Sequence, residues 1–335
     1  MNDLLRDDRY GSHIARLTNT CAALIGAALI LVAATAACAQ DYPNRLIRAY
    51  MGFPAGTYLD IVTRHFTDRL AQLSGQTVIV ENKVGASGMM AMEAGARSKP
   101  DGYTLVFGPG LSASAFQFKS LAFDPVKDFT RVATIVAFPF ILLVNPRATP
   151  VSSVAELTQL LKTKSKVSYA APNTPSLIAG ALFAKAEGIA AAAVQYKSTA
   201  DAVRDLNAGD LEYMFVDAGF ALAQIREGRL RGLAVTLPQR TPNAPDLPTM
   251  IEAGVPDVSF FGWMGVYLPA GAPPEAAAKL ARWLEQIENA EETKAFFRRI
   301  GADPFYKSPD EFTRFEADEF KRWQERARLA NVEAQ

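Results

Sequence analysis

Short apolar runs alternate with segments of helical periodicity along most of the chain, and this alternation restricts the fold more than any other feature. A short apolar run is typical of a buried strand, whereas apolar residues three or four apart mark one face of a helix. Strands that alternate with helices favour parallel-type sheets flanked by helices on both faces. Two such sets, joined by apolar crossings near residues 140–145 and 232–237, predict an α/β protein with two lobes and a hinge.

The N-terminus has the pattern of a secretory leader. Residues 21–39 are almost purely apolar and end in Ala37-Cys38-Ala39, a small-x-small cleavage pattern. We expect a signal peptide over residues 1–39, cleavage after Ala39, and a periplasmic mature chain that is not embedded in a membrane. Two alternatives stay open: a lipoprotein attached through Cys38, and an uncleaved membrane anchor.

The first of the two lobes is expected to be discontinuous along the mature chain, with the second inserted into it. The first would contain residues 40–141 and 238–335, and the second would contain residues 142–237. The final helix, capped by Ser308-Pro309-Asp310-Glu311, is expected to cover the fold.

Composition excludes several classes of function. The chain has 35 basic and 35 acidic residues without a long basic run, so nucleic acid is not an expected partner. Both cysteines lie in the leader, which leaves no disulfide or thiolate chemistry in the mature chain. His65 remains as the single histidine, and we expect it to be a structural or surface residue. With no hydrolase elbow, phosphate loop or zinc motif, we predict no catalytic residues, no metal and no cofactor.

The stretch Gly52–Asp60 joins a strand to a helix and is the first candidate for a ligand site. A helix N-terminus exposes backbone N–H groups and partial positive charge, so it suits a carboxylate. Residues 171–176 repeat this geometry, with Thr174 as the expected N-cap and Pro175 at the first helical position. The two loops could face each other across a cleft and hold one anion. An ordinary turn is the alternative interpretation of the first loop.

Further candidates lie at the C-terminal ends of strands, where open α/β sheets bind their ligands. Lys197 and Asp217 could equally be solvated loop charges, and Trp263 could be a core residue. The complete set of predicted ligand-binding residues is Phe53, Ala55, Gly56, Thr57, Tyr58, Asp60, Gly108, Ser112, Ala171, Asn173, Thr174, Ser176, Tyr196, Lys197, Asp217 and Trp263.

A series of short motifs runs in a fixed order through nearly the whole mature chain. They are Tyr42-Pro43, Ile47-Arg48, Phe53-Pro54-Ala55-Gly56 with Asp60, Val80-Glu81-Asn82-Lys83 with Gly85 and Gly88, Pro100 to Leu105, Phe123 to Phe129, Val144-Asn145-Pro146, Tyr196-Lys197, Met214-Phe215, Gly232 to Thr236, Asp246 to Thr249, and Pro269-Ala270-Gly271. Together and in this order, the motifs resemble the extracytoplasmic solute-binding proteins of tripartite tricarboxylate transporters, also called Bug proteins.

The resemblance implies a type II periplasmic-binding-protein fold that closes like a Venus flytrap. It also implies a small organic carboxylate, aromatic or dicarboxylate, held by backbone groups of the loops at 54–60 and 171–176. Transporter membrane subunits would be the partners, and the protein would not be an enzyme. A receptor that reports to a membrane signalling protein, and an exported enzyme using Asp60 or Asp217, are the alternatives.

The first loop departs from the family pattern. Where the family has Gly-Gly-Gly-Thr or Gly-Gly-Ser-Thr before the aspartate, this chain has Gly56-Thr57-Tyr58-Leu59. We hypothesise that Tyr58 reshapes the pocket for a ligand with an apolar or aromatic body. The polar contacts would then come from Thr57, Asn173, Thr174 and Ser176. Loss of carboxylate binding is the alternative.

Two other departures concern the second lobe. Pro172 and Pro175 each remove a backbone N–H donor from the second loop. The family's aspartate after Met-Phe is Val216 here, and Asp217 follows one place later. Because side chains alternate along a strand, this shift could turn the carboxylate away from the pocket.

Overall fold

The structure is a computed structural model that describes residues 42–114 and 120–332. Leu46–Gln335 form one unit, which contains both sheets. The signal peptide, its cleavage after Ala39 and the alternative attachment at Cys38 lie outside the described residues.

The first lobe is built on a mixed five-stranded sheet with the order β2-β1-β3-β10-β4. Its strands are β1 (Ile47–Met51), β2 (Val78–Asn82), β3 (Thr104–Pro109), β4 (Phe129–Phe138) and β10 (Gly262–Pro269). The pairs of β1 with β2 and β3 are parallel, whereas β10 runs antiparallel to β3 and β4. The strand β2 lies at the sheet edge, where Ile79 is 43% exposed.

Helices cover this sheet on both faces, as the alternating pattern predicted. They are α2 (Tyr58–Ser74), η1 (Ala86–Gly88), α3 (Met89–Ala96), α4 (Leu111–Ser114), α9 (Pro274–Asn289), α10 (Glu291–Ile300) and α11 (Pro309–Leu329). The spacing of Val62, Phe66 and Leu70 places all three side chains in the core, each fully buried. Gly75 ends α2 in the left-handed region, with φ 68°, which glycine adopts without steric cost.

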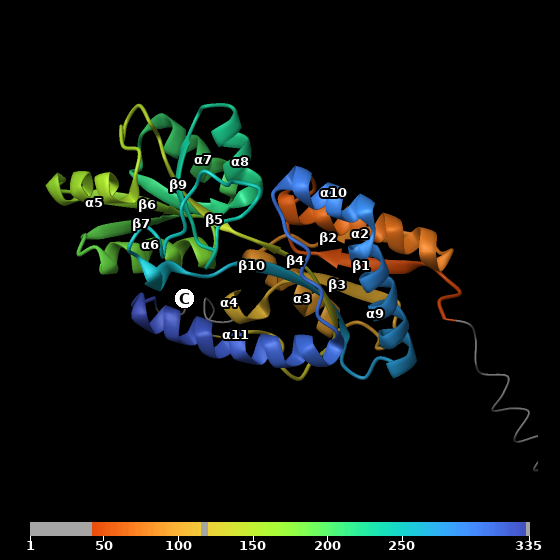
Figure 1. The fold of residues 1–335 in the computed structure, drawn as a ribbon. Coiled ribbons are helices and arrows are strands. Elements are labelled where there is room, and N and C mark those ends of the chain that lie inside the picture. The colour runs from red at the N-terminus through yellow and green to blue at the C-terminus, as the bar shows by residue number, and fades with distance from the viewer. Residues whose placement is uncertain (1–41, 115–119, 333–335) are drawn as a thin grey trace, which may run out of the picture. The chain divides into compact units, whose positions relative to one another are not determined.

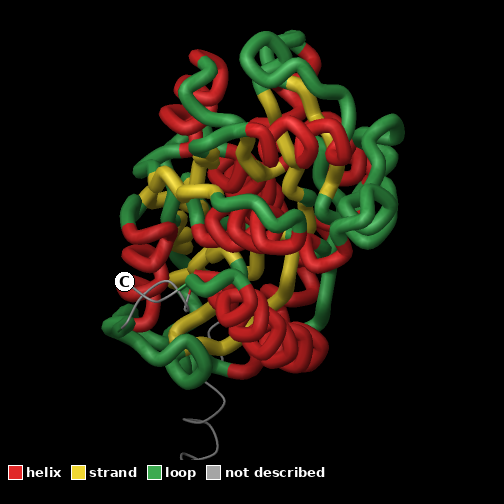
Figure 2. Tube along the Cα trace, turned by 90° about the vertical axis from the view of Figure 1, so that its left-hand side faces the viewer, coloured by secondary structure: helices red, strands yellow, loops and turns green. Residues whose placement is uncertain are grey.

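The second lobe is built on another mixed sheet, with the order β7-β6-β8-β5-β9. Its strands are β5 (Phe140–Val144), β6 (Val167–Ala171), β7 (Ala191–Gln195), β8 (Tyr213–Asp217) and β9 (Arg231–Val235), and its helices are α5 (Val154–Thr163), α6 (Thr174–Ala186), α7 (Thr199–Ala208) and α8 (Ala218–Arg226). Here β5 is the antiparallel strand, paired with β8 and β9. Figure 1 shows these elements in green, and Figure 2 shows the helices around the strands from the side.

The chain changes sheet at Pro139, between Phe138 at the end of β4 and Phe140 at the start of β5. It returns after β9 through a connection that contains η2 (Pro256–Val258) and then enters β10. The exact boundaries of the two domains stay a prediction. The last helix, α11, packs against α4 and β4 of the first lobe and against α6 of the second (Figure 1).

Three local expectations need correction. The N-cap of α6 is Asn173, one residue before the predicted Thr174, because the Asn173 carboxamide accepts the Ser176 amide. The sequence analysis did not predict β4 or α8. The parallel-type sheets that we expected are mixed, although the two-lobed α/β fold class is confirmed.

Candidate functional site

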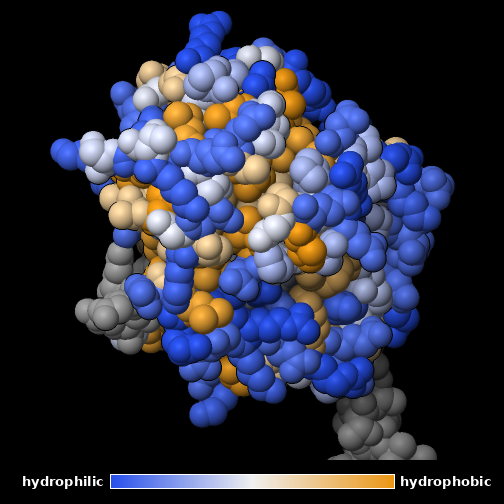
Figure 3. Space-filling model, turned by 60° about the vertical axis from the view of Figure 1, so that its left-hand side comes forward, coloured by the Kyte–Doolittle hydropathy of each residue, from blue (hydrophilic) through white to orange (hydrophobic). Residues whose placement is uncertain are grey.

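A cleft with a cavity of about 730 Å³ lies between the two sheets. Its walls come from both lobes, and apolar surface lines recesses in the otherwise hydrophilic face that Figure 3 shows. The volume is in the range of small-molecule sites, which are concave and mostly apolar with a few polar groups.

Four helices present their first turns to this cleft. The lining includes Thr57 and Tyr58 at the start of α2, Thr174 in α6, Thr199 in α7 and Asp217 before α8. Helix N-termini carry orphan N–H donors and partial positive charge, so their convergence favours an anionic ligand group.

The cleft end of α2 differs from the other three because no side chain caps it. Asn173, Ser198 and Asp217 each accept a backbone amide in the first turn of α6, α7 and α8. Thr57, the N-cap of α2, makes no such bond, and its hydroxyl instead donates to the Pro54 carbonyl at 2.7 Å. The first turn of α2, which lines the cleft, therefore has no side-chain acceptor for its amides.

Asp60 stabilises the conformation of the loop before α2 without lining the cleft. Its side chain is fully buried, and its oxygens accept the Gly56 amide at 2.8 Å, Asn82 Nδ2 at 2.7 Å and Arg64 Nε at 2.9 Å. Burial alone would raise the pKa of Asp60, but the hydrogen bonds from Arg64, Asn82 and Gly56 lower it overall. Asp60 is absent from the lining of the cleft.

Tyr58 lies on the wall of the cleft and is 8% exposed. Its ring meets Phe138 edge-on at 5.2 Å and lies against Gly219 of α8, where a Cβ would stand 2.1 Å from Tyr58 Cδ2. Burial raises the pKa of the Tyr58 hydroxyl well above its usual value, and the charges of Asp217 and Asp303 add to the shift. Tyr58 thus connects the first lobe to α8 of the second.

The backbone beside Tyr58 is unusually close to another loop. A Cβ at Gly52 would lie 2.4 Å from the Gly88 Cα, so two glycines let two backbones meet here. Next to them, Ala86 and Ser87 have φ of 47° and 52°, a conformation that residues other than glycine rarely adopt. Such conformations cluster at ligand sites, and both residues line the cleft.

Asp217 faces the cleft, contrary to the expectation from strand alternation. It is the last residue of β8, and its Oδ1 accepts the Phe220 amide at 3.3 Å as the N-cap of α8. Burial raises the pKa of Asp217 to about 6, although amides of the first turn of α8 oppose the shift. No ion pair among the described residues includes Asp217 or Lys197, which also lines the cleft.

The predicted site residues fall into two groups. Those that line the cleft are Phe53, Thr57, Tyr58, Asn173, Thr174, Tyr196, Lys197, Asp217 and Trp263. Those outside the lining are Ala55, Gly56, Asp60, Gly108, Ser112, Ala171 and Ser176. A ligand contact at each residue stays a prediction.

Several residues outside the lining have structural partners. The Ser176 hydroxyl donates to Asn173 Oδ1 at 2.8 Å, and the Ala171 carbonyl accepts the Tyr196 amide. A Cβ at Gly108 would lie 2.6 Å from Met92 Sδ, which explains the glycine by packing. Ser112 is fully buried, and its Oγ lacks a hydrogen-bond partner within the described part of the chain.

The sequence analysis missed a set of aromatic residues in the cleft. They come from both sides of the crossing at Pro139, from the start of β10 and from α11: Phe138, Phe140, Phe261 and Trp323. Phe138, Phe140 and Phe261 lie in apolar stretches that predict core packing equally well, and Trp323 lies among charged residues of α11, so a sequence signal for their role was lacking. The expectation for His65 agrees with its contacts, because its ring stacks on Phe296 at 4.1 Å and pairs with Thr293.

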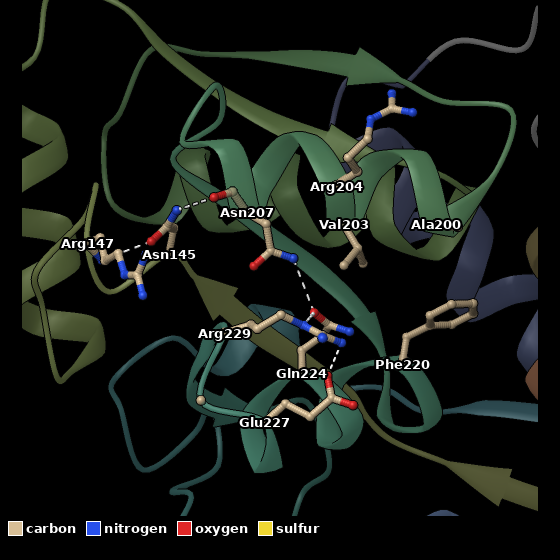
Figure 4. Close-up of a pocket in the computed structure, with 11 residues that line it drawn as sticks. Asn145, Arg147, Ala200, Val203, Arg204, Asn207, Phe220, Gln224, Glu227 and Arg229 are labelled. Atoms are coloured by element: carbon tan, nitrogen blue, oxygen red, sulfur yellow. Dashed lines mark hydrogen bonds and ion pairs between the residues drawn. The ribbon is translucent and has the colours of Figure 1, made fainter.

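A second cavity, of about 680 Å³, opens between α7 and α8 of the second lobe (Figure 4). Its polar side chains largely bind one another. Gln224 Oε1 accepts both Asn207 Nδ2 at 3.1 Å and Arg229 Nε at 2.9 Å. Arg204 bonds to the neighbouring carboxylates of α7. These groups hold the helices together, so the cleft between the sheets is the better candidate.

Two kinds of feature are absent from the described residues. Residues 42–114 and 120–332 contain no group of three or more potential metal-ligating side chains. The helices in these ranges are also too short or too polar for one to cross a membrane.

Comparison with known proteins agrees with this architecture. Residues 62–331 match the family model described as the tripartite tricarboxylate transporter family receptor. The protein BugT of Bordetella pertussis is 30% identical over 290 residues, which cover 85% of this chain and 89% of that protein.

Two solved structures of ligand complexes are similar. Rpa4515 of R. palustris with adipate has a TM-score of 0.83 at 30% identity, covering 88% of this chain and 100% of that one. MatC of Rhodopseudomonas palustris with bound malate has a TM-score of 0.77 at 27% identity, covering 85% of this chain and 99% of that one.

A third similar structure is that of BugD, described as a periplasmic binding protein. It has a TM-score of 0.80 at 28% identity, covering 88% of this chain and 100% of that one.

The fold has two lobes around a cleft, and the N-terminal ends of four helices line that cleft. This arrangement is that of a solute-binding receptor. The matching family model is described as a receptor, and BugD is described as a periplasmic binding protein. The chain belongs to the tripartite tricarboxylate transporter receptor family, whose named members include Bug proteins.

Proposed function

We propose that the chain is a periplasmic receptor that closes its two lobes around a small organic carboxylate and delivers it to the membrane subunits of a tripartite transporter. The uncapped first turn of α2 carries this proposal, because it leaves donors directed at the cleft. The capped first turns of α6, α7 and α8 add positive potential from the opposite lobe.

The relatives support the class of ligand. Rpa4515 is described with adipate and MatC with malate, both small carboxylates. The predicted leader, cleaved after Ala39, would place the mature protein in the periplasm, where such a receptor meets its solute.

Thermal unfolding of the purified protein with a panel of organic acids tests the proposal. A ligand that binds only the folded state stabilises it by about 2.7 kcal/mol at a hundredfold excess over Kd. We expect a selective rise in Tm for one class of carboxylate. Folded protein that shows no shift with any mono-, di- or tricarboxylate would contradict the proposed function.

A pair of variants separates the α2 backbone from the Tyr58 side chain. Tyr58→Gly removes the side chain and keeps the amide, whereas Tyr58→Pro removes both, and proline is well tolerated at the first position of a helix. We expect Tyr58→Pro to bind carboxylates more weakly than Tyr58→Gly. Equal affinities in the two variants would show that the amide is not a ligand donor.

A further inference from the structure

We propose that the cleft selects an aromatic monocarboxylate bearing a hydroxyl or amino group, and that Asp217 sets this selectivity by accepting that group and repelling a second carboxylate. This inference rests on the proposed function and names the ligand class of the same cleft. It differs from the ligands described for the neighbours, which are dicarboxylates.

The aromatic part of the proposal comes from a row of rings on the hinge side of the cleft. Tyr58 meets Phe138 at 5.2 Å, and Phe138 lies 6.1 Å from Phe140 across the crossing at Pro139. Phe261 and Trp263 of the first lobe also line the cleft. Aromatic side chains favour offset or edge-on contact with another ring, so these walls suit a flat aromatic body.

The charges in the cleft match a single carboxylate. Among the described residues of the lining, Lys197 is the one basic side chain and Asp217 the one acidic side chain. One carboxylate can be neutralised by Lys197 and the free donors of α2. Pro172 and Pro175, both in the lining, supply no N–H donor for a second.

The position of Asp217 determines which chemical group fits at the end of the ligand opposite its carboxylate. Its Oδ1 accepts the Phe220 amide, and the side chain takes part in no ion pair within the described ranges. An ionised carboxylate accepts hydrogen bonds but cannot donate them. A hydroxyl or amino group would therefore be bound, whereas a like charge in a partly desolvated site would be repelled.

The size of Tyr58 contributes to the same selectivity. Its ring extends from the first residue of α2 and packs against Gly219, near the end of α8 that Asp217 caps. Gly219 follows Asp217 by two residues, so the contact of the Tyr58 ring with Gly219 brings Tyr58 to the end of α8 that Asp217 caps. A ligand ring that rests on Phe138 and Tyr58 would thus direct one edge toward Asp217.

Isothermal titration with two ligands of matched shape tests the inference. Terephthalate and 4-hydroxybenzoate share the ring and one carboxylate, and they differ at the opposite position by a carboxylate or a hydroxyl. We expect the wild-type protein to bind 4-hydroxybenzoate at least about tenfold more tightly than terephthalate, with adipate and malate weaker still.

The variant Asp217→Asn removes the charge and keeps a side chain that caps α8. We expect it to lower the preference for 4-hydroxybenzoate over terephthalate by about tenfold or more. Asp246→Asn, at an exposed residue outside the cleft, is the matched control and should keep the wild-type ratio.

The outcomes separate this inference from the proposed function. Equal affinity of the wild-type protein for both aromatic acids, a ratio unchanged by Asp217→Asn, or a preference for adipate or malate would overturn the inference and leave a carboxylate receptor. Absence of binding to every acid in the panel would overturn the proposed function as well.

Discussion

Replacing Glu288 with glutamine is expected to change how the stability of the protein depends on pH. Glu288 lies near the end of α9 and is 2% exposed, and burial raises its pKa from 4.5 to about 9. The backbone amides of Phe305 and Tyr306 oppose the shift, although neither Glu288 oxygen has a hydrogen-bond partner among the described residues, and the charge of Glu285 adds to it. The carboxyl is therefore neutral in the folded protein at pH 7.

The sign of the effect follows from proton uptake on folding. Between pH 4.5 and 9 the folded state holds a proton on Glu288 that the unfolded state has lost, so the free energy of unfolding falls as pH rises. The slope is about 1.4 kcal/mol per pH unit, which gives a loss of about 4 kcal/mol between pH 5 and pH 8. Glutamine cannot ionise, so Glu288→Gln removes this slope.

Urea unfolding of both proteins at pH 5, 6, 7 and 8 measures the difference. We expect similar stability at pH 5 and a growing advantage of Glu288→Gln toward pH 8, reaching about 4 kcal/mol. Glu275→Gln, at an exposed position in the first turn of α9, is the control and should follow the wild-type profile. Parallel profiles for wild type and Glu288→Gln would refute the reasoning.

Three further predictions concern the cleft and its support. Gly219→Ala would place a Cβ 2.1 Å from the Tyr58 ring and should cost about 1–3 kcal/mol in urea unfolding, with less cost in a Tyr58→Gly background. Arg131→Met would leave the fully buried Glu316 without its 2.7 Å partner and should cost about 3–5 kcal/mol; an unchanged urea midpoint would contradict this. The pKa of Asp60 in the folded protein lies below 3.8, so the ionised carboxylate stabilises the fold above pH 3.8, and this stabilisation is lost as the pH falls through the folded pKa. Asp60→Asn should therefore reduce the difference in the free energy of unfolding between pH 5 and pH 3, measured by urea unfolding.

Local structure could be predicted from the sequence where a residue interacts with its own neighbours in the chain. Ser198 and Gly209 cap the two ends of α7, because a hydroxyl N-cap and a left-handed glycine need only adjacent backbone. The loop at Gly52–Asp60 was singled out for the same reason, since a strand, a glycine-containing turn and an amphipathic helix follow one another directly.

The roles of Asp60 and Asp217 could not be predicted this way. Both follow apolar runs and both were predicted to contact ligand, yet Asp60 bonds to Arg64 and Asn82 behind the loop, whereas Asp217 faces the cleft. The difference depends on Asn82, which reaches Asp60 because β2 pairs with β1.

By itself, the sequence determined the two-lobed α/β class, the order of most elements and the loops at which helices begin, because periodicity and caps act over a few residues. The tertiary structure decided which side chains meet. Tyr58 contacts Phe138 and Gly219 because α2, β4 and α8 converge at the crossing between the sheets. Contacts between residues far apart in the chain depend on how the two sheets pack, and short-range sequence patterns do not encode that packing.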